Sequence, residues 1–394
     1  MADAADPRPH VFDLTPDELS AWLVEHGLAK FRAAQVLDWV YRKGIVDPQA
    51  MTNLAAADRD RLAGLLRFTA GDVVREQLAS DGTRKLLIDW SSRPPLEQDN
   101  AALPVLPDDD SAYAGDRTEC VMIPADRGRR RTACISSQVG CPVGCRFCAS
   151  GLGGLDRNLT AGQIVEQAWR LAWMPDPTHP DRQPTGLSNI VFMGMGEPLS
   201  NYPAVIRAIT ALTADWGLNL SARKVTLSTV GLPAQMRRLA DAGLPPITLA
   251  VSLHAPNDEL RREIIPWAER VSIDQLVDAG RYYFDRTGRE VTLEYILLGN
   301  LNDQPSHARE LATVAKRLRS NVNLIRYNEV AGLPYARPDD DDVHRFQRVL
   351  RDRGVNAHLR ASRGRDIAAA CGQLRHEAAQ QPQPTASPAS PASA

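Results

Sequence analysis

The sequence contains no long apolar run, and this absence predicts a protein without membrane-spanning helices. No stretch of the 394 residues approaches the ~20 consecutive apolar residues that such a helix needs. The first ten residues are polar and acidic and contain no apolar core. We therefore expect no signal peptide and no membrane partner.

Cysteine and net charge are both scarce. The chain has six cysteines, four of them in one short stretch, which is not the pattern of a secreted disulfide framework, so we expect a reducing, cytoplasmic compartment. The formal net charge of −2 neither requires nor excludes nucleic acid, because a local basic patch can lie on a nearly neutral protein. The 43% hydrophobic and 24% charged residues are typical of a globular protein, here one large domain with an appendage.

The clustered cysteines indicate a metal site. They are Cys134, Cys141, Cys145 and Cys148, and the last three follow the spacing C-x3-C-x2-C. Thiolates select zinc, Cu(I) or an iron–sulfur cluster. A structural zinc site usually takes two ligand pairs, but no second pair follows, and Cys120 and Cys371 stand alone. A [4Fe–4S] cluster normally takes four cysteines, so three would leave one iron open. The alternatives are a zinc knuckle with a distant ligand and three unconnected buried thiols.

From residue 133 onward, apolar strand-like segments alternate with amphipathic helical ones. The predicted strands are 133–136, 189–193, 224–229, 247–253, 290–298, 323–327 and a late one near 355–361. This alternation is typical of a parallel sheet covered by helices. The six main units predict an α/β fold, a partial (β/α)6 TIM-like barrel over residues 132–376, with a doubly wound open sheet as the alternative. In either fold, functional residues gather at the carboxyl ends of the strands.

A small helical unit precedes this core, at residues 12–70. Its first helix is predicted to begin at the capping box formed by Thr15 and Glu18. A second helix, 31–42, presents Arg32, Arg42 and Lys43 on one face. These cations indicate either a solvated face or an RNA-binding surface.

Residues 80–131 are predicted to lead into the core. Strand-like segments 83–90 and 118–123 predict a hairpin, and the Pro- and Asp-rich segment 91–116 between them reads as a mobile insertion. A basic loop follows, and its candidates for phosphate contact are Arg127, Arg129, Arg130 and Arg131. The low-complexity tail 380–394 is predicted to be disordered.

Unusual residues follow several predicted strands. Strand 189–193 runs into Gly194-Met195-Gly196-Glu197-Pro198, where glycine allows close approach of a ligand and Glu197 could pair with an ammonium group. Other strand ends carry Ser228, Ser252-Leu253-His254 and Asn328. One such end is most often an ordinary turn. Four in succession, after a cysteine loop on the first strand, predict a binding site.

Four motifs together resemble one known family. They are residues 134–141, 194–199, 252–254 and 363–374, the last reading RGRDIAAACGQL. They are similar to those of the RlmN/Cfr family of radical S-adenosylmethionine (SAM) RNA adenine methyltransferases, over about residues 12–376. Arg365 departs from the pattern, because the family often has an acidic residue there.

The resemblance implies a set of site residues. Cys141, Cys145 and Cys148 would hold a [4Fe–4S] cluster with its fourth site open to SAM. The implied SAM-binding residues are Gly196, Glu197, Ser228, Ser252, Leu253, His254 and Asn328. Cys371 would carry a methyl group, Cys134 would be its partner, and Glu119 would accept a proton. Cys120 is interpreted as strand packing.

The resemblance also implies partners and a reaction. The substrates would be 23S rRNA and tRNA, an electron donor such as flavodoxin or ferredoxin would act with the enzyme, and the chain would be a monomer. The C2 carbon of adenine is electron-poor and cannot attack the methyl group of SAM, whereas a thiolate can. Cys371 would therefore take the methyl from one SAM, a second SAM would supply a radical, and Cys134 would release the product by forming a disulfide with Cys371. The alternatives are methylation at C8, a radical-SAM enzyme with a non-RNA substrate, and a zinc or RNA-binding protein without enzymatic activity.

Overall fold

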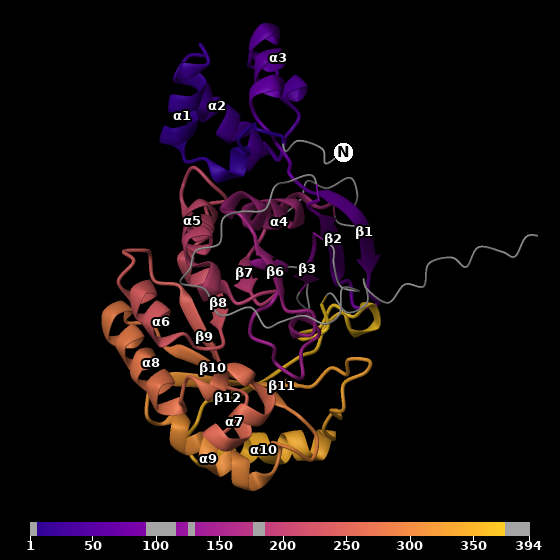
Figure 1. The fold of residues 1–394 in the computed structure, drawn as a ribbon, viewed down its shortest axis with the longest axis vertical. Helices are drawn as coiled ribbons and strands as arrows, with labels where there is room; N and C mark the ends of the chain where they lie inside the picture. Colours follow the sequence, from indigo (N-terminus) through magenta and orange to yellow (C-terminus); the bar gives the residue numbers. More distant parts are fainter. Residues whose placement is uncertain (1–5, 92–115, 125–130, 176–185, 375–394) are drawn as a thin grey trace, which may run out of the picture.

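The computed structural model describes residues 6–91, 116–124, 131–175 and 186–374 (Figure 1). Three predictions fall outside these ranges: most of the 91–116 insertion, the 380–394 tail, and the basic residues Arg127, Arg129 and Arg130. No helix among the described residues is both long enough and apolar enough to cross a membrane.

A single large sheet organises the chain. Its ten strands lie in the order β1-β2-β3-β4-β7-β8-β9-β10-β11-β12. Their bounds are β1 Asp72–Leu78, β2 Arg84–Asp89, β3 Arg117–Pro124, β4 Arg131–Cys134, β7 Asn189–Phe192, β8 Val225–Thr229, β9 Thr248–Ser252, β10 Val291–Leu297, β11 Ser320–Arg326 and β12 Ala357–Arg360. The pairs from β4 to β12 are all parallel, so the predicted α/β core is confirmed.

Helices connect the parallel strands. They are α4 (Ala161–Trp173), α5 (Tyr202–Thr213), α6 (Pro233–Ala240), α7 (Asp258–Ile264), α8 (Ile273–Thr287), α9 (Pro305–Ala315) and α10 (Asp340–Asp352). A capping box formed by Thr160 and Gln163 begins α4, and the predicted capping box at Thr15 and Glu18 begins α1 (Pro16–Glu25). The short helix α7 was not predicted; the side chain of Asn257 caps it by accepting from the Leu260 N–H.

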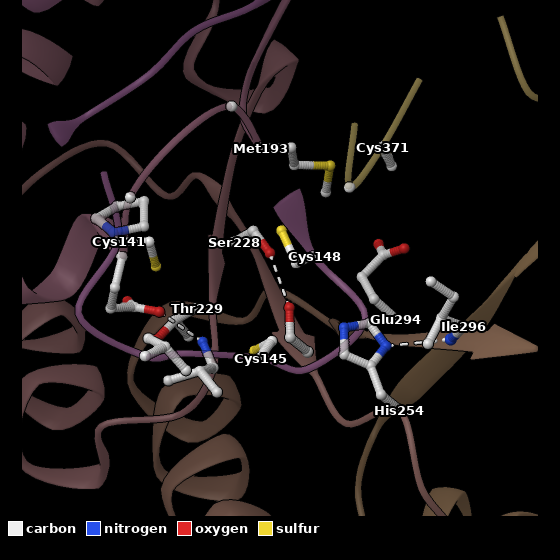
Figure 2. Close-up of a pocket in the computed structure, with 18 of the residues that line it drawn as sticks. Cys141, Cys145, Cys148, Met193, Ser228, Thr229, His254, Glu294, Ile296 and Cys371 are labelled. Atoms are coloured by element: carbon white, nitrogen blue, oxygen red, sulfur yellow. Dashed lines mark hydrogen bonds between the residues drawn. The ribbon is translucent and has the colours of Figure 1, made fainter. Parts of the chain in front are cut away.

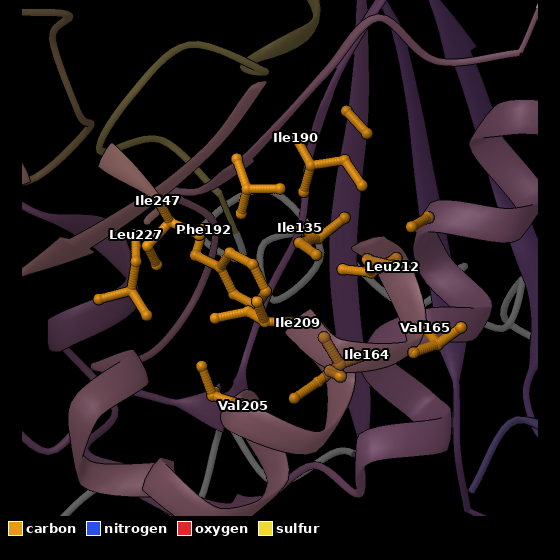
Figure 3. Packing of buried hydrophobic residues seen from close by; sticks show 14 of the residues in the cluster. Ile135, Ile164, Val165, Ile190, Phe192, Val205, Ile209, Leu212, Leu227 and Ile247 are labelled. Atoms are coloured by element: carbon orange, nitrogen blue, oxygen red, sulfur yellow. The ribbon is translucent and has the colours of Figure 1, made fainter. Parts of the chain in front are cut away.

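The core lies between these helices and the sheet. Figure 3 shows Ile164 and Val165 of α4, with Val205, Ile209 and Leu212 of α5, close to buried side chains of the strands. Those strand residues include Ile190, Phe192 and Leu227. Because their side chains are removed from water on folding, this layer holds the carboxyl ends of the strands in fixed positions.

An antiparallel extension precedes the parallel strands. β2 and β3 pair as the predicted hairpin, and β3 continues antiparallel into β4. The sequence prediction missed β1, which pairs with β2 at the edge of the sheet. Most β1 residues are exposed, so the strand lacks the apolar alternation that would have predicted it. A separate two-stranded sheet is formed by β5 (Gln138–Gly140) and β6 (Leu155–Asn158), and the cysteine loop connects these two strands. The sequence prediction missed this sheet as well.

The N-terminal helical unit packs on α4 and lies at the opposite end of the molecule from α9 and α10 (Figure 1). It contains α1 (Pro16–Glu25), α2 (Arg32–Leu37), the π-helical turn Asp38–Arg42, and α3 (Ala56–Leu65). Buried Glu166 of α4 accepts the Ala70 N–H at 2.8 Å and lies 3.1 Å from His10 Nε2. A Cβ at Gly44 would lie 2.2 Å from the Trp173 ring, so the unit and α4 are in close contact.

Candidate active site

A cavity lies at the carboxyl ends of the parallel strands (Figure 2). Its walls contain most of the predicted site residues: Cys141, Cys145, Cys148, Gly196, Glu197, Ser228, Ser252, His254 and Cys371. They come from segments as far apart as the β5–β6 connection and the chain after β12. The structure therefore brings most of the predicted strand-end residues to one cavity, but Leu253 and Asn328 do not line it.

The cysteine loop owes its shape to two glycines and to hydrogen bonds with its surroundings. Gly140 and Gly144 have positive φ angles of 78° and 68°. The Cys141 N–H donates to the Gly154 carbonyl at 2.6 Å, which ties the loop to the segment before β6. Figure 2 shows Cys141, Cys145 and Cys148 around the same space. Each side chain is partly exposed and no disulfide joins them.

Thiolates such as those of the cysteine loop suit zinc or an iron–sulfur cluster. Among the described residues, no group of three His, Cys, Asp or Glu side chains is placed to hold one metal ion. Desolvation raises the pKa of Cys141, Cys145 and Cys148. Thiols in such surroundings need a nearby cation to ionise, and a cluster would supply it.

Glu197 lines the cavity directly after Gly194 and Gly196. Its Oε2 accepts the Val230 N–H at 2.7 Å and its Oε1 accepts the Leu199 N–H at 3.0 Å. Burial raises the pKa of Glu197 to about 7, because these hydrogen bonds do not fully offset desolvation. Gly196 must be glycine: its φ is 102°, and a Cβ there would lie 2.7 Å from the Cβ of Gln138.

The next strand ends supply polar groups opposite Glu197. The hydroxyls of Ser228 and Ser252 lie 3.3 Å apart. Burial lowers the pKa of His254 to about 3, so its ring is neutral at pH 7. The His254 Nδ1 accepts the Ile296 N–H at 3.1 Å, which places the ring proton on Nε2. The ring is therefore fixed as a neutral hydrogen-bond donor.

Leu253 and Asn328 do not line the cavity, but they form hydrogen bonds with residues next to it. The buried Leu253 carbonyl accepts from Arg261 Nε at 3.2 Å. The Asn328 side-chain amide donates to the Cys371 carbonyl at 3.4 Å, and its Oδ1 accepts from Arg337 at 3.2 Å. Asn328 thus contacts the segment that carries Cys371.

Cys134 and Cys371 come from opposite ends of the core but lie near each other. Cys134 ends β4 and packs in an apolar group with Met195, Ile367 and Ala369, the last two shortly before Cys371. Burial raises the pKa of Cys134, and the neighbouring Cys371 adds to this rise. Cys371 is exposed as a residue but lines the cavity, and both thiols are free. The predicted pair is therefore brought together without a disulfide.

Glu119, the predicted proton acceptor, forms a buried ion pair that the sequence analysis missed. Its Oε1 lies 3.0 Å from Lys85 Nζ, and both side chains are at most 3% exposed. Lys85 also donates to the Ala368 carbonyl at 3.2 Å. The ion pair therefore connects β2 and β3 to the segment before Cys371.

Two further charged residues of the site were not predicted. Arg261 of α7 is fully buried, and its guanidinium donates to the carbonyls of Leu253, Val230 and Val271. Glu294 of β10 lines the cavity, and burial raises its pKa. A glutamate within the otherwise apolar end of β10 was the available signal for Glu294. Arg261 gave none, because charged residues dominate the sequence of α7.

Comparison with known proteins decides the family. Residues 10–67 match the family model for the ribosomal RNA large subunit methyltransferase N-terminal domain, and residues 135–312 match that for the radical SAM superfamily. The chain is 41% identical over 378 residues to a probable dual-specificity RNA methyltransferase RlmN of Rhodopirellula baltica, covering 95% of this chain and 93% of that one. The chain belongs to the RlmN family.

Other RlmN-family relatives agree. A probable dual-specificity RNA methyltransferase RlmN of Salinibacter ruber is 43% identical over 365 residues, covering 91% of this chain and 92% of that one. The crystal structure of a radical SAM methyltransferase from Sphaerobacter thermophilus superposes with a TM-score of 0.82 at 41% identity, covering 94% of this chain and all of that one. The chain is thus a radical-SAM RNA methyltransferase, and membership of the RlmN family implies a [4Fe–4S] cluster and SAM as its cofactors.

Four of the basic residues predicted to contact RNA lie in the described ranges, and each has a partner within the chain. Arg32 pairs with Asp58 at 2.6 Å, and Lys43 lies 3.6 Å from the centre of the Trp39 ring. The Arg42 guanidinium donates to the Asp215 carbonyl. Arg131 donates to the carbonyls of Leu171 and Met174 at the end of α4. Each of these four cations therefore stabilises the fold, and RNA contact by them stays a prediction.

Proposed function

We propose that this enzyme methylates the C2 carbon of adenine in 23S rRNA and in tRNA, with Cys371 carrying the methyl group. The observation that supports this most directly is the position of Cys371. It lines the same cavity as the three loop cysteines, with Cys134 nearby. A radical-SAM enzyme that used only a cluster and SAM would not need these two extra thiols.

The cavity has ligands suited to both cofactors. Cys141, Cys145 and Cys148 would hold the cluster. Glu197 would pair with the ammonium group of SAM, while Ser228, Ser252 and His254 Nε2 offer hydrogen-bonding groups from the facing strand ends. Gly196 lacks a side chain and so leaves space for SAM beside Glu197. Leu253 and Asn328 would hold neighbouring residues of the cavity in position. When bound, the cluster and SAM would supply a radical able to remove a hydrogen atom from a methyl group.

The thiols would divide the remaining chemistry between them. The Cys371 thiol gives up its proton and its sulfur attacks the methyl carbon of one SAM, forming a thioether and releasing S-adenosylhomocysteine. After a hydrogen atom is removed from that methyl group, its carbon bonds to C2 of adenine. The Cys134 sulfur then attacks the Cys371 sulfur. The methylene carbon leaves with the base and takes up a proton to become a methyl group, while the unpaired electron left on the base would pass back to the cluster. The new Cys134–Cys371 disulfide must be reduced by two electrons before another cycle. A flavodoxin or ferredoxin would supply electrons.

The proton on C2 needs an acceptor in the same region. Glu119 and Cys134 are the candidates, because β3 and β4 place them on neighbouring strands. Lys85 supplies a positive charge that keeps a buried Glu119 carboxylate favourable. Glu119 is thereby held near the residues that precede Cys371.

The decisive test uses anaerobically reconstituted enzyme with SAM and a 23S rRNA fragment. Mass spectrometry that separates 2-methyladenosine from 8-methyladenosine should find only the C2 product. Replacing the rRNA fragment with tRNA tests the second substrate. The C8 product would establish the alternative regiochemistry, and a lack of methylation of either RNA would refute the proposed function.

Cysteine variants test the roles of the thiols. Cys371→Ala should retain the iron content and SAM cleavage of the parent enzyme but lose methyl transfer by at least about a thousandfold, because no thioether can form. Cys134→Ala should accumulate enzyme linked to RNA. Cys120→Ala is the matched control, since Cys120 is a buried free cysteine of β3 outside the cavity. Methylated RNA from Cys371→Ala would overturn the scheme.

A further inference from the structure

A second cavity lies at the carboxyl ends of the last two strands, outside the one described above. It has a volume of about 360 Å³, and its lining includes Arg326, Arg337, Arg360, Ser362 and Arg365. Arg326 and Arg360 are the final residues of β11 and β12, which pair in parallel. Arg337 comes from the connection to α10, and Arg365 from the turn after β12. The fold therefore gathers four arginines from four separate positions.

The protein neutralises this group only in part. Asp340 pairs with Arg326 at 2.5 Å, but no described carboxylate forms an ion pair with Arg337, Arg360 or Arg365. The Nε of Arg326 is buried and lacks a hydrogen-bond acceptor within the described part of the chain. Desolvation lowers the pKa of Arg337 and the charges of Arg365 and Arg326 lower it further, while the charges of Asp340 and Glu329 oppose this fall without cancelling it. Like charges held this close repel one another until an anion joins them.

Arginine also indicates which anion fits. A guanidinium group presents its donors as a planar fork that matches two oxygens of a phosphate. Arg360 and Arg365 are exposed, so their side chains can meet a large ligand arriving from solvent. A single small carboxylate would leave most of these donors unused, whereas a polymer with consecutive phosphates would engage several.

The arginine cavity is connected to the methyl-carrying segment. Arg337 donates both to the Tyr327 carbonyl and to the Asn328 side chain, and Asn328 donates to the Cys371 carbonyl. Desolvation raises the pKa of Cys371, and the positive charge of Arg360 opposes this rise, so Arg360 lies within electrostatic reach of that thiol. An anion bound in the arginine cavity would thus lie beside the place where the base must arrive.

We propose that Arg326, Arg337, Arg360 and Arg365 form a binding site for the backbone phosphates of the RNA substrate, next to the nucleotide whose base reaches Cys371. This inference rests on the proposed function and adds the surface that positions the RNA backbone. The site holds the chain on one side of the cavity so that the target base enters it. Arg365 adds a positive charge where the family often has an acidic residue, and it strengthens this site.

The test compares RNA binding by Arg360→Gln, Arg365→Gln and the double variant with that of the unaltered enzyme. Arg348→Gln is the matched control, because Arg348 is an exposed arginine of α10 outside the cavity. The double variant should bind an RNA hairpin about tenfold more weakly, and its plot of log K against log salt should flatten by about 0.7 to 1 per lost phosphate contact. Arg365→Lys should restore part of the affinity, since it keeps the charge. The control should match the unaltered enzyme, and all variants should keep the same Tm.

Two results would overturn the inference. One is an unchanged salt dependence in the double variant. The other is weakened SAM affinity with unchanged RNA affinity, because the arginines would then bind the carboxylate of SAM. These failures differ from a failure of the proposed function. In that case the unaltered enzyme would not methylate RNA at all, whereas here it methylates RNA normally and the variants bind RNA as it does.

Discussion

Glu197 illustrates how one buried residue can link pH to cofactor binding. Its carboxyl group keeps a proton up to about pH 7, because burial disfavours the charged form. An unfolded glutamate ionises near its ordinary value of about 4.3. Folding stability therefore falls as the pH rises from about 4.3 to about 7. A bound ammonium group would remove that cost by pairing with the Glu197 carboxylate.

The affinity for SAM should consequently fall as the pH falls through 7. With a pKa of about 7, only about a tenth of Glu197 is ionised at pH 6, so SAM should bind about tenfold more weakly there than at pH 8. Calorimetry in buffers of different ionisation enthalpy should detect proton release on binding at pH 6.5. Glu197→Gln should bind weakly with no such pH dependence. If that variant kept the pH dependence, another group would be responsible.

At the scale of elements, the N-terminal helical unit is joined to the core mainly through α4. Glu166 accepts from Ala70 N–H and Arg170, and it also contacts His10. Desolvation would raise the pKa of Glu166, but His10 and Arg170 outweigh it and the net shift is downward. The stabilisation from these contacts is therefore complete above the ordinary carboxyl pKa and is lost as the pH falls through the lowered value.

Removing the charge of Glu166 should loosen this junction. Glu166→Gln is expected to lower the free energy of unfolding by about 3 kcal/mol, because it leaves the Arg170 guanidinium without its buried carboxylate. Hydrogen exchange should rise first in residues 10–67, the unit that packs on α4. Glu25→Gln, an exposed glutamate of α1, is the control and should have no measurable effect. Equal destabilisation by both variants would show that Glu166 contributes no more to stability than an exposed glutamate does.

The sequence predicted elements well where a face is buried and poorly where it is exposed. The parallel strands have strong apolar patterns, and they appear as expected. β1 and α7 are short, charged or exposed, so tertiary pairing determines them and periodicity does not reveal them. Similarly, polar residues at strand ends predicted the cavity. The buried partners Lys85 and Arg261 could not be predicted, because their roles depend on which carbonyls and carboxylates face them.

At the scale of the whole molecule, the β1–β2 turn holds the segment that carries Cys371. The Asp81 carboxylate accepts the Gly364 N–H at 3.0 Å, and Asp366 accepts the Ser80 N–H at 2.8 Å. Burial would raise the pKa of Asp81, but hydrogen bonds from Thr83 and Gly364 outweigh it, so the net shift is downward. The carboxylate stays ionised at neutral pH.

Asp81→Ala should therefore release this segment while leaving the strand-end residues of the cavity in place. We expect faster hydrogen exchange in residues 364–371 and methyl transfer slowed about tenfold, with SAM affinity unchanged. Asp72→Ala, at the exposed start of β1, is the matched control. Slow hydrogen exchange in the Asp81 variant would show that the Lys85 and Asp366 contacts are sufficient to hold residues 364–371 in place.

The contact between Lys85 and Ala368 also has a consequence for the time course of biosynthesis. The two residues are 283 positions apart. At about 5 to 20 residues per second, a ribosome needs about 15 to 60 s after making Lys85 before Ala368 is added. Cys134 and the three loop cysteines are synthesised within that interval. A nascent chain can therefore present the proposed cluster ligands for loading well before the thiol proposed to receive the methyl group exists.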